Sequence, residues 1–62
     1  MDATLVNDEI EAVMRTIRLA QAQVATLKKI CAGDTSRLEE LESVEVVLDM
    51  VMRKLEALKI AG

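Results

Sequence analysis

Gly33 is the only residue between the two ends of this chain that readily interrupts a helix. The 62 residues contain no proline, and the only other glycine is Gly62 at the C-terminus. Because proline and glycine are the strongest breakers of regular structure, the chain consists of two long uninterrupted segments. A β-sheet protein would need several turn signals, whereas this chain has one. The sequence therefore predicts an all-α protein.

The first segment shows apolar residues at alternating steps of three and four, the spacing that forms one row along a helix. This row consists of Ile10, Val13, Ile17, Ala20, Val24, Leu27 and Cys31. Asn7 is a good N-cap residue, and three acidic residues follow it within the first turn, where they suit the positive end of a helix. We expect this helix to run from about residue 8 to residue 32.

A turn is expected at residues 33–35. Gly33 can adopt the left-handed backbone conformation that commonly ends a helix. Asp34 and Ser36 are both good N-cap residues, and Ser36 followed by Glu39 has the form of a capping box. A second helix should therefore start directly after the turn.

The second helix is expected from about residue 36 to residue 60, and it repeats the steps of three and four. Its row consists of Leu41, Val44, Leu48, Val51, Leu55 and Leu58. Two helices of similar length joined by a short turn fold back antiparallel. We predict one domain over residues 1–62, an antiparallel two-helix hairpin with coiled-coil-like packing that dimerisation or a helical partner would complete.

The charges favour the same topology. The first helix starts acidic and ends with Lys28 and Lys29, whereas the second helix starts acidic and carries Arg53, Lys54 and Lys59 near its end. An antiparallel hairpin places opposite charges beside each other at both ends. The reverse arrangement would oppose like charges throughout.

Composition excludes several classes of function. The net charge of −3 argues against nucleic-acid binding, and no apolar run approaches the roughly 20 residues of a membrane span. The single cysteine and the absence of histidine leave no disulfide and no zinc set, so we expect no metal and no cofactor. The acidic N-terminal residues do not resemble a secretion signal. These features predict a cytoplasmic protein.

No catalytic site is predicted, so we do not expect an enzyme. Glu45 and Asp49 are four positions apart, but paired carboxylates act only with a pocket and a third group, and a solvated face is the simpler interpretation. Cys31 has no histidine to activate it and is interpreted as a small core residue.

A second apolar stripe indicates a protein partner. Val46, Met50 and Ile60 lie along the face opposite the row of the second helix, and Met14 and Leu19 lie outside the row of the first. A hairpin cannot bury these residues, and contiguous exposed apolar surface marks interfaces in soluble proteins. We therefore predict these five residues as the partner-binding site.

Residues 7–62 resemble the small co-chaperones of type III secretion needle subunits, the YscE-like proteins. The similarity lies in Val13–Ile17, in Leu27–Lys29 leading into Gly33 and Asp34, and in the apolar and acidic second helix. The resemblance implies a cytoplasmic hairpin that pairs with a helical-repeat chaperone and helps to keep the needle subunit from polymerising before export. The second helix departs from these relatives in having no aromatic residue.

Three alternatives remain open. The first is a self-associating helical-bundle regulator or adaptor, which is a homo-oligomer. The second is RNA binding through the basic residues Arg15, Arg18, Lys28 and Lys29, although no aromatic residue is present to stack on bases. The third is a BAG-like chaperone-binding domain, which the chain resembles at residues 23–25 and 51–53. The third helix with which that family binds its chaperone is missing here.

Overall fold

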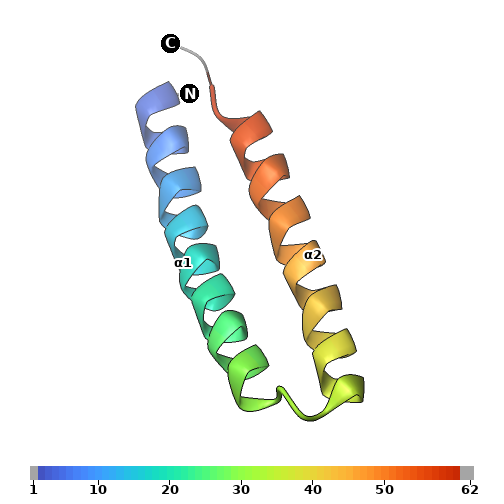
Figure 1. The fold of residues 1–62 in the computed structure, drawn as a ribbon. Coiled ribbons are helices and arrows are strands. Elements are labelled where there is room, and N and C mark those ends of the chain that lie inside the picture. Colours follow the sequence, from blue (N-terminus) through green and yellow to red (C-terminus); the bar gives the residue numbers. More distant parts are fainter. Residues whose placement is uncertain (1, 61–62) are drawn as a thin grey trace.

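The computed structural model describes residues 2–60 and consists of two antiparallel helices joined by a short turn (Figure 1). Helix α1 spans Ala3–Ile30 and helix α2 spans Thr35–Leu58. The Cα atoms extend over 49 × 15 × 12 Å, so the molecule is a flat rod two helices wide. The predicted all-α hairpin is confirmed.

Helix α1 starts five residues earlier than predicted, because Asp2 is its N-cap and Asn7 is not. The carboxylate of Asp2 accepts a hydrogen bond of 2.9 Å from the backbone N–H of Thr4. The residues between them and Asn7 are compatible with a helix, so the helix continues back to the first residue that can cap it. Asn7 lies inside the helix, and its side chain forms hydrogen bonds with the backbone of Ile60.

The turn does not use a left-handed glycine. No described residue has a positive φ, Gly33 included. Helix α1 ends at Ile30, with Cys31 as its C-cap, and the backbone N–H of Asp34 donates to the carbonyl of Cys31 at 2.9 Å. The predicted conformation of Gly33 was wrong because this ordinary turn hydrogen bond closes the chain instead.

Helix α2 is capped by Asp34, one of the N-cap residues expected from the sequence, and not by the capping box expected at Ser36. Its carboxylate accepts from the backbone N–H of Arg37 at 3.1 Å and also lies 3.4 Å from the guanidinium of Arg37. One side chain thus satisfies a free N–H of the first turn and binds a nearby cation. The helix ends at Leu58, two residues before the predicted end.

The buried face of α1 is turned relative to the predicted row. Ile10, Met14 and Val24 are its buried residues, and Met14 is completely inaccessible to solvent. Val13, which the row predicted as core, is 46% exposed, and Leu27 is exposed to a similar degree. The contact face therefore steps from Ile10 to Met14 where the prediction stepped to Val13.

The contact face of α2 is likewise turned relative to its predicted row. Leu41, Leu48 and Leu55 face α1 as predicted and are half-buried. The other three predicted members, Val44, Val51 and Leu58, are exposed. The other half-buried residues of α2 are Leu38, Glu45 and Met52, and Lys59 directly after the helix is half-buried as well. No described residue of α2 is fully buried, so the core consists of three side chains from α1.

Candidate protein-binding surfaces

One side of the junction between the helices is closed by polar contacts. The ammonium of Lys28 lies 2.9 Å from the carboxylate of Glu45, and Lys59 forms an ion pair with Glu11. These pairs confirm the predicted meeting of opposite charges at both ends of the hairpin. A hydrogen bond from Lys59 and its positive charge lower the pKa of Glu11, while a hydrogen bond to Glu45 raises the pKa of Lys28.

Helical geometry places these polar contacts on one flank. A residue four positions after a core residue is rotated by about 40° to one side, and a residue three positions after it by about 60° to the other. Four positions after the inward-facing residues Ile10, Ile17 and Val24 of α1 come Met14, Gln21 and Lys28. After Leu41, Leu48 and Leu55 of α2 come Glu45, Met52 and, one residue past the helix end, Lys59. Because the helices are antiparallel and face each other, these fourth positions share one side of the hairpin. We call it the closed flank.

The third positions share the opposite side, which is apolar and open. This open flank consists of Val13, Ala20 and Leu27 of α1 and Val44, Val51 and Leu58 of α2. Five of these six side chains are exposed, and Ala20 is half-buried. These six side chains carry no charge, and the charged residues Arg37 and Glu40 line a pocket at the turn end of the same flank. All six residues belong to the apolar rows that were predicted to form the core.

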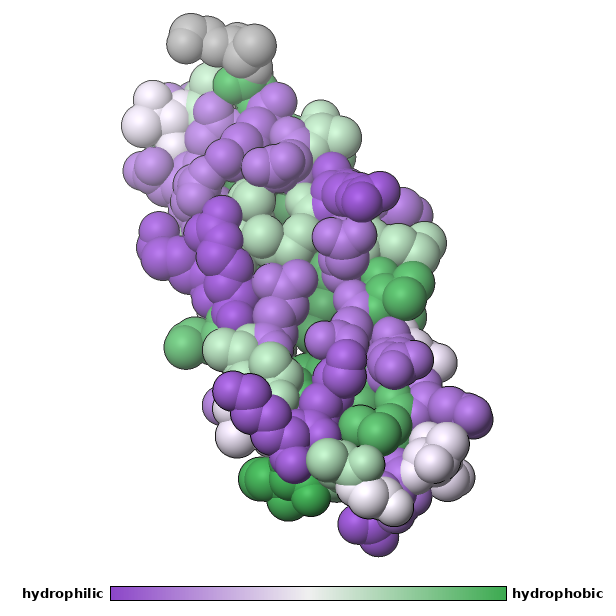
Figure 2. Space-filling view, in the orientation of Figure 1, coloured by the Kyte–Doolittle hydropathy of each residue, from purple (hydrophilic) through white to green (hydrophobic). Residues whose placement is uncertain are grey.

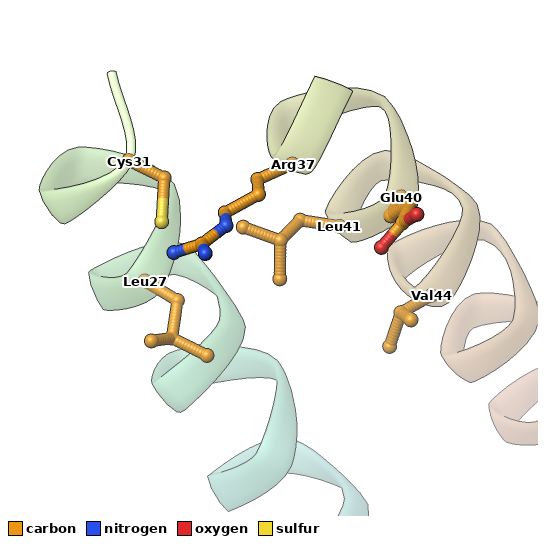
Figure 3. Close-up of a pocket in the computed structure, with 6 residues that line it drawn as sticks. All are labelled: Leu27, Cys31, Arg37, Glu40, Leu41 and Val44. Atoms are coloured by element: carbon orange, nitrogen blue, oxygen red, sulfur yellow. The ribbon is translucent and has the colours of Figure 1, made fainter. Parts of the chain in front are cut away.

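A pocket of about 350 Å³ opens on this flank beside the turn. Leu27 of α1 and its C-cap Cys31 line it from one side, and Leu41 and Val44 of α2 line it from the other. Arg37 reaches across toward Cys31, and Glu40 completes the lining (Figure 3). The pocket shows that the two helices do not close over the open flank. An apolar side chain from another molecule could enter it at this end.

A second exposed apolar patch lies on the outside of α2. Val46 is 59% exposed and Met50 is 53% exposed, and Val47 beside them is exposed as well. Residues three and four positions apart are neighbours on a helix surface, so these three side chains adjoin. We call Val46, Val47 and Met50 the outer patch.

The other predicted partner-binding residues do not join this patch. Leu19 is exposed, but it lies two positions after core residue Ile17 and therefore faces outward from α1, on the opposite edge of the hairpin. Ile60 is exposed beyond the end of α2, where its backbone binds Asn7. Met14 was wrongly predicted: its side chain is fully buried, four positions after the buried residue Ile10, and cannot meet a partner.

The residues considered for catalysis either form ion pairs or line the pocket. Glu45 binds Lys28, and Asp49 lies 3.2 Å from Arg53 one turn further on. Cys31 is a half-buried free thiol. Among residues 2–60 no group of three potential metal ligands comes together, and neither helix there has the length and apolar content that crossing a membrane takes.

The face of the molecule in Figure 2 carries hydrophilic side chains along both helices, with smaller hydrophobic groups between them. Comparison with known proteins adds no relative: no family model, no curated protein and no solved structure matches the chain at a significant level. The case for function therefore depends on the surfaces described above.

Proposed function

We propose that this chain is a protein-binding helical hairpin, an adaptor or co-chaperone rather than an enzyme. One observation supports this most strongly. Among the described residues, twelve large hydrophobic side chains are exposed while three are buried. Single exposed apolar residues are common, but such an excess over the core is typical of a protein that completes its apolar contacts with another polypeptide.

The outer patch is the docking site we propose for a foreign helical partner. Val46, Val47 and Met50 form a compact apolar surface, and methionine adapts its shape to irregular partner surfaces. Each side chain is about half exposed, so covering the patch contributes about 1 kcal/mol per residue, or roughly 3 kcal/mol in total. This is less than a stable complex needs. The partner must therefore also contact the polar residues around the patch.

The resemblance to YscE-like proteins supplies the proposed biological setting. A cytoplasmic co-chaperone of type III secretion would use this patch to bind a helical-repeat chaperone, and the pair would hold the needle subunit. A subunit that polymerises through its apolar helix faces must have those faces covered before export. A hairpin with adaptable apolar surface is suited to contribute to such a cover.

The test is binding by matched surface variants. The tagged protein is used to capture its partner from the native host, the partner is identified and purified, and binding is then measured between the two pure proteins. Val46→Glu with Met50→Glu should weaken this binding at least tenfold while circular dichroism stays helical. Leu5→Glu replaces an equally exposed apolar residue on α1 and should change the affinity less than twofold.

A second pair of variants separates this function from its alternatives. Leu19→Glu shows whether the outer side of α1 contributes, and Lys29→Glu removes an exposed positive charge. Rim charges mainly alter association rate and salt dependence, so Lys29→Glu should have a small effect on affinity. If Lys29 is essential and the outer patch is dispensable, the proposal fails and RNA binding gains support.

A further inference from the structure

We propose that the open flank is covered by a second copy of this chain, so that two hairpins form a four-helix bundle. The inference concerns another face than that of Val46 and Met50, which lie on the outside of α2, while Val47 borders the open flank between Val44 and Val51. It concerns the six residues Val13, Ala20, Leu27, Val44, Val51 and Leu58.

The chain exposes more surface than a compact protein of its mass. Its accessible surface is 4780 Å² for a mass of 6.8 kDa. The area–mass relation for compact monomers gives about 3,950 Å² at this mass, so the excess is about 800 Å². One partner in a standard protein–protein interface buries about 800 Å². The excess therefore matches the share of one hairpin in a stable dimer.

The shape of the flank fits a copy of itself. The face is a rod 49 Å long and 15 Å wide between Cα atoms, and the chain has no aromatic residue that would project from it. A second hairpin has the same length and flatness. The two faces can therefore overlap along their whole length, which a shorter or curved partner surface would not achieve.

The open flank also has side-chain sizes that complement each other about a two-fold axis. Counting from the ion pair of Lys28 with Glu45, the register places Val13 beside Leu58, Ala20 beside Val51, and Leu27 beside Val44. An axis parallel to the helices stacks α1 of one copy on α2 of the other. Each Leu then meets a Val, and each Ala meets a Val. Alternating large and small residues in this way fills the layers of a helical bundle.

The charge distribution permits this contact between two negative molecules. All six side chains of the open flank are uncharged, and Lys28, Glu45, Glu11 and Lys59 are paired on the closed flank. The two charged residues that line the pocket on this flank, Arg37 and Glu40, have opposite signs, so the contact does not oppose a surplus of like charge.

The experiment measures molecular mass by sedimentation equilibrium for the wild type and for two matched variants. Val44→Glu places a carboxylate on the open flank, and Val46→Glu places one on the outer patch two positions away. Both new side chains lie four positions after an existing glutamate, Glu40 or Glu42, so their local helix environments match. Wild type and Val46→Glu should have twice the chain mass of 6.8 kDa at micromolar concentration. Val44→Glu should dissociate at least tenfold more readily.

Leu58→Glu is the second open-flank variant, in case Val44→Glu does not fold. Leu58 is highly exposed at the last residue of α2, so its substitution disturbs the hairpin least. It too should raise the dissociation constant at least tenfold while circular dichroism stays helical. A wild type that stays at 6.8 kDa up to millimolar concentration overturns the proposal. So does a dimer that survives both open-flank variants and is lost with Val46→Glu. A wild type that stays monomeric leaves foreign binding at the outer patch untouched, whereas loss of the dimer with Val46→Glu would assign the outer patch to self-association.

Discussion

The side chain of Asn7 forms two hydrogen bonds with the backbone of Ile60, which lies 53 positions away in the sequence. Its amide nitrogen donates to the carbonyl of Ile60 at 2.8 Å, and its amide oxygen accepts from the N–H of Ile60 at 2.8 Å. Asparagine has both groups in one plane, so it can replace a backbone partner at the point where α2 has ended. This contact joins the N-terminal part of α1 to the residue two positions after the end of α2.

Replacing Asn7 with Ala should release the end of α2 with little effect on global stability. The two exposed hydrogen bonds contribute on the order of 1 kcal/mol each, and alanine recovers several tenths of that through its higher helix propensity. The amide of Ile60 should exchange with deuterium clearly faster in Asn7→Ala than in the wild type. Unchanged exchange at Ile60 would mean that the contact does not form in solution.

Met14 and Val13 are neighbours whose truncation should have very different effects. Met14→Ala removes a fully buried side chain and should reduce the free energy of unfolding by about 2 to 5 kcal/mol. Val13→Ala removes a half-exposed one and should cost less than 1 kcal/mol in the monomer, with any larger loss confined to the dimer. Urea unfolding at low protein concentration measures both. Similar losses in the two variants would show that the face of α1 is misassigned. Met14→Leu, which keeps most of the volume, serves as the conservative control.

The hairpin itself follows from the sequence, because one interruption and the opposed charges leave no other compact arrangement. The rotation of the two contact faces does not follow from it. Residues Val13 and Met14 are both apolar, as are Val51 and Met52, so a spacing of three and a spacing of four are equally consistent with the pattern. The choice was settled by tertiary contacts that hydrophobicity alone does not reveal.

Lys28, Glu45 and Lys59 show why polarity misled the prediction. Each directly follows an apolar residue of the predicted row, and the apolar member was placed in the core. In the structure these charged side chains lie half-buried on the closed flank instead, because each forms an ion pair with a residue of the other helix segment. In an antiparallel hairpin, residues that face each other have nearly the same sum of residue numbers, as in the pairs Lys28–Glu45 and Glu11–Lys59. A search of the sequence for opposite charges at such positions could have identified this face.

Gly33 provides a test of the turn. Its φ is not positive, and a Cβ atom built on it meets no other atom within 4 Å. Gly33→Ala should therefore stabilise the hairpin by about 0.4 to 1 kcal/mol, since alanine restricts the unfolded chain more than glycine does. The free energy of unfolding measures this change. A loss of about 1 kcal/mol or more would instead indicate the left-handed conformation that the sequence suggested.

The ion pair of Glu11 with Lys59 should make stability depend on pH in the acidic range. Lys59 holds the pKa of Glu11 below its ordinary value of 4.5 in the folded chain. The pair therefore stabilises the fold above that pH, and its contribution is lost as the pH falls through the folded-state pKa. The stability difference between wild type and Glu11→Gln should shrink on acidification. A difference that is independent of pH would exclude the pair.

The pair of Lys28 with Glu45 should act at the other end of the pH scale. The hydrogen bond to Glu45 raises the pKa of Lys28 above its ordinary value of 10.5. Its contribution is therefore complete below that value and is lost as the pH rises through the folded-state pKa. Lys28→Met should remove this alkaline dependence and leave the acidic one unchanged. Thermal unfolding of the variant across the alkaline range checks both expectations.

The dependence of thermal stability on protein concentration tests most directly whether the exposed apolar surface is an interface. Among residues 2–60 three side chains are buried in one hairpin, so the proposal assigns much of the stability to association. For a folded dimer that unfolds to monomers, a hundredfold rise in concentration adds about 2.7 kcal/mol per dimer and should raise Tm by roughly 5 to 10 °C. Circular dichroism melts of the wild type from about 2 μM to 200 μM give this shift, and Val44→Glu should largely abolish it. A Tm that is the same at both concentrations would contradict the account, because it would show that one hairpin is stable with its apolar flank in water.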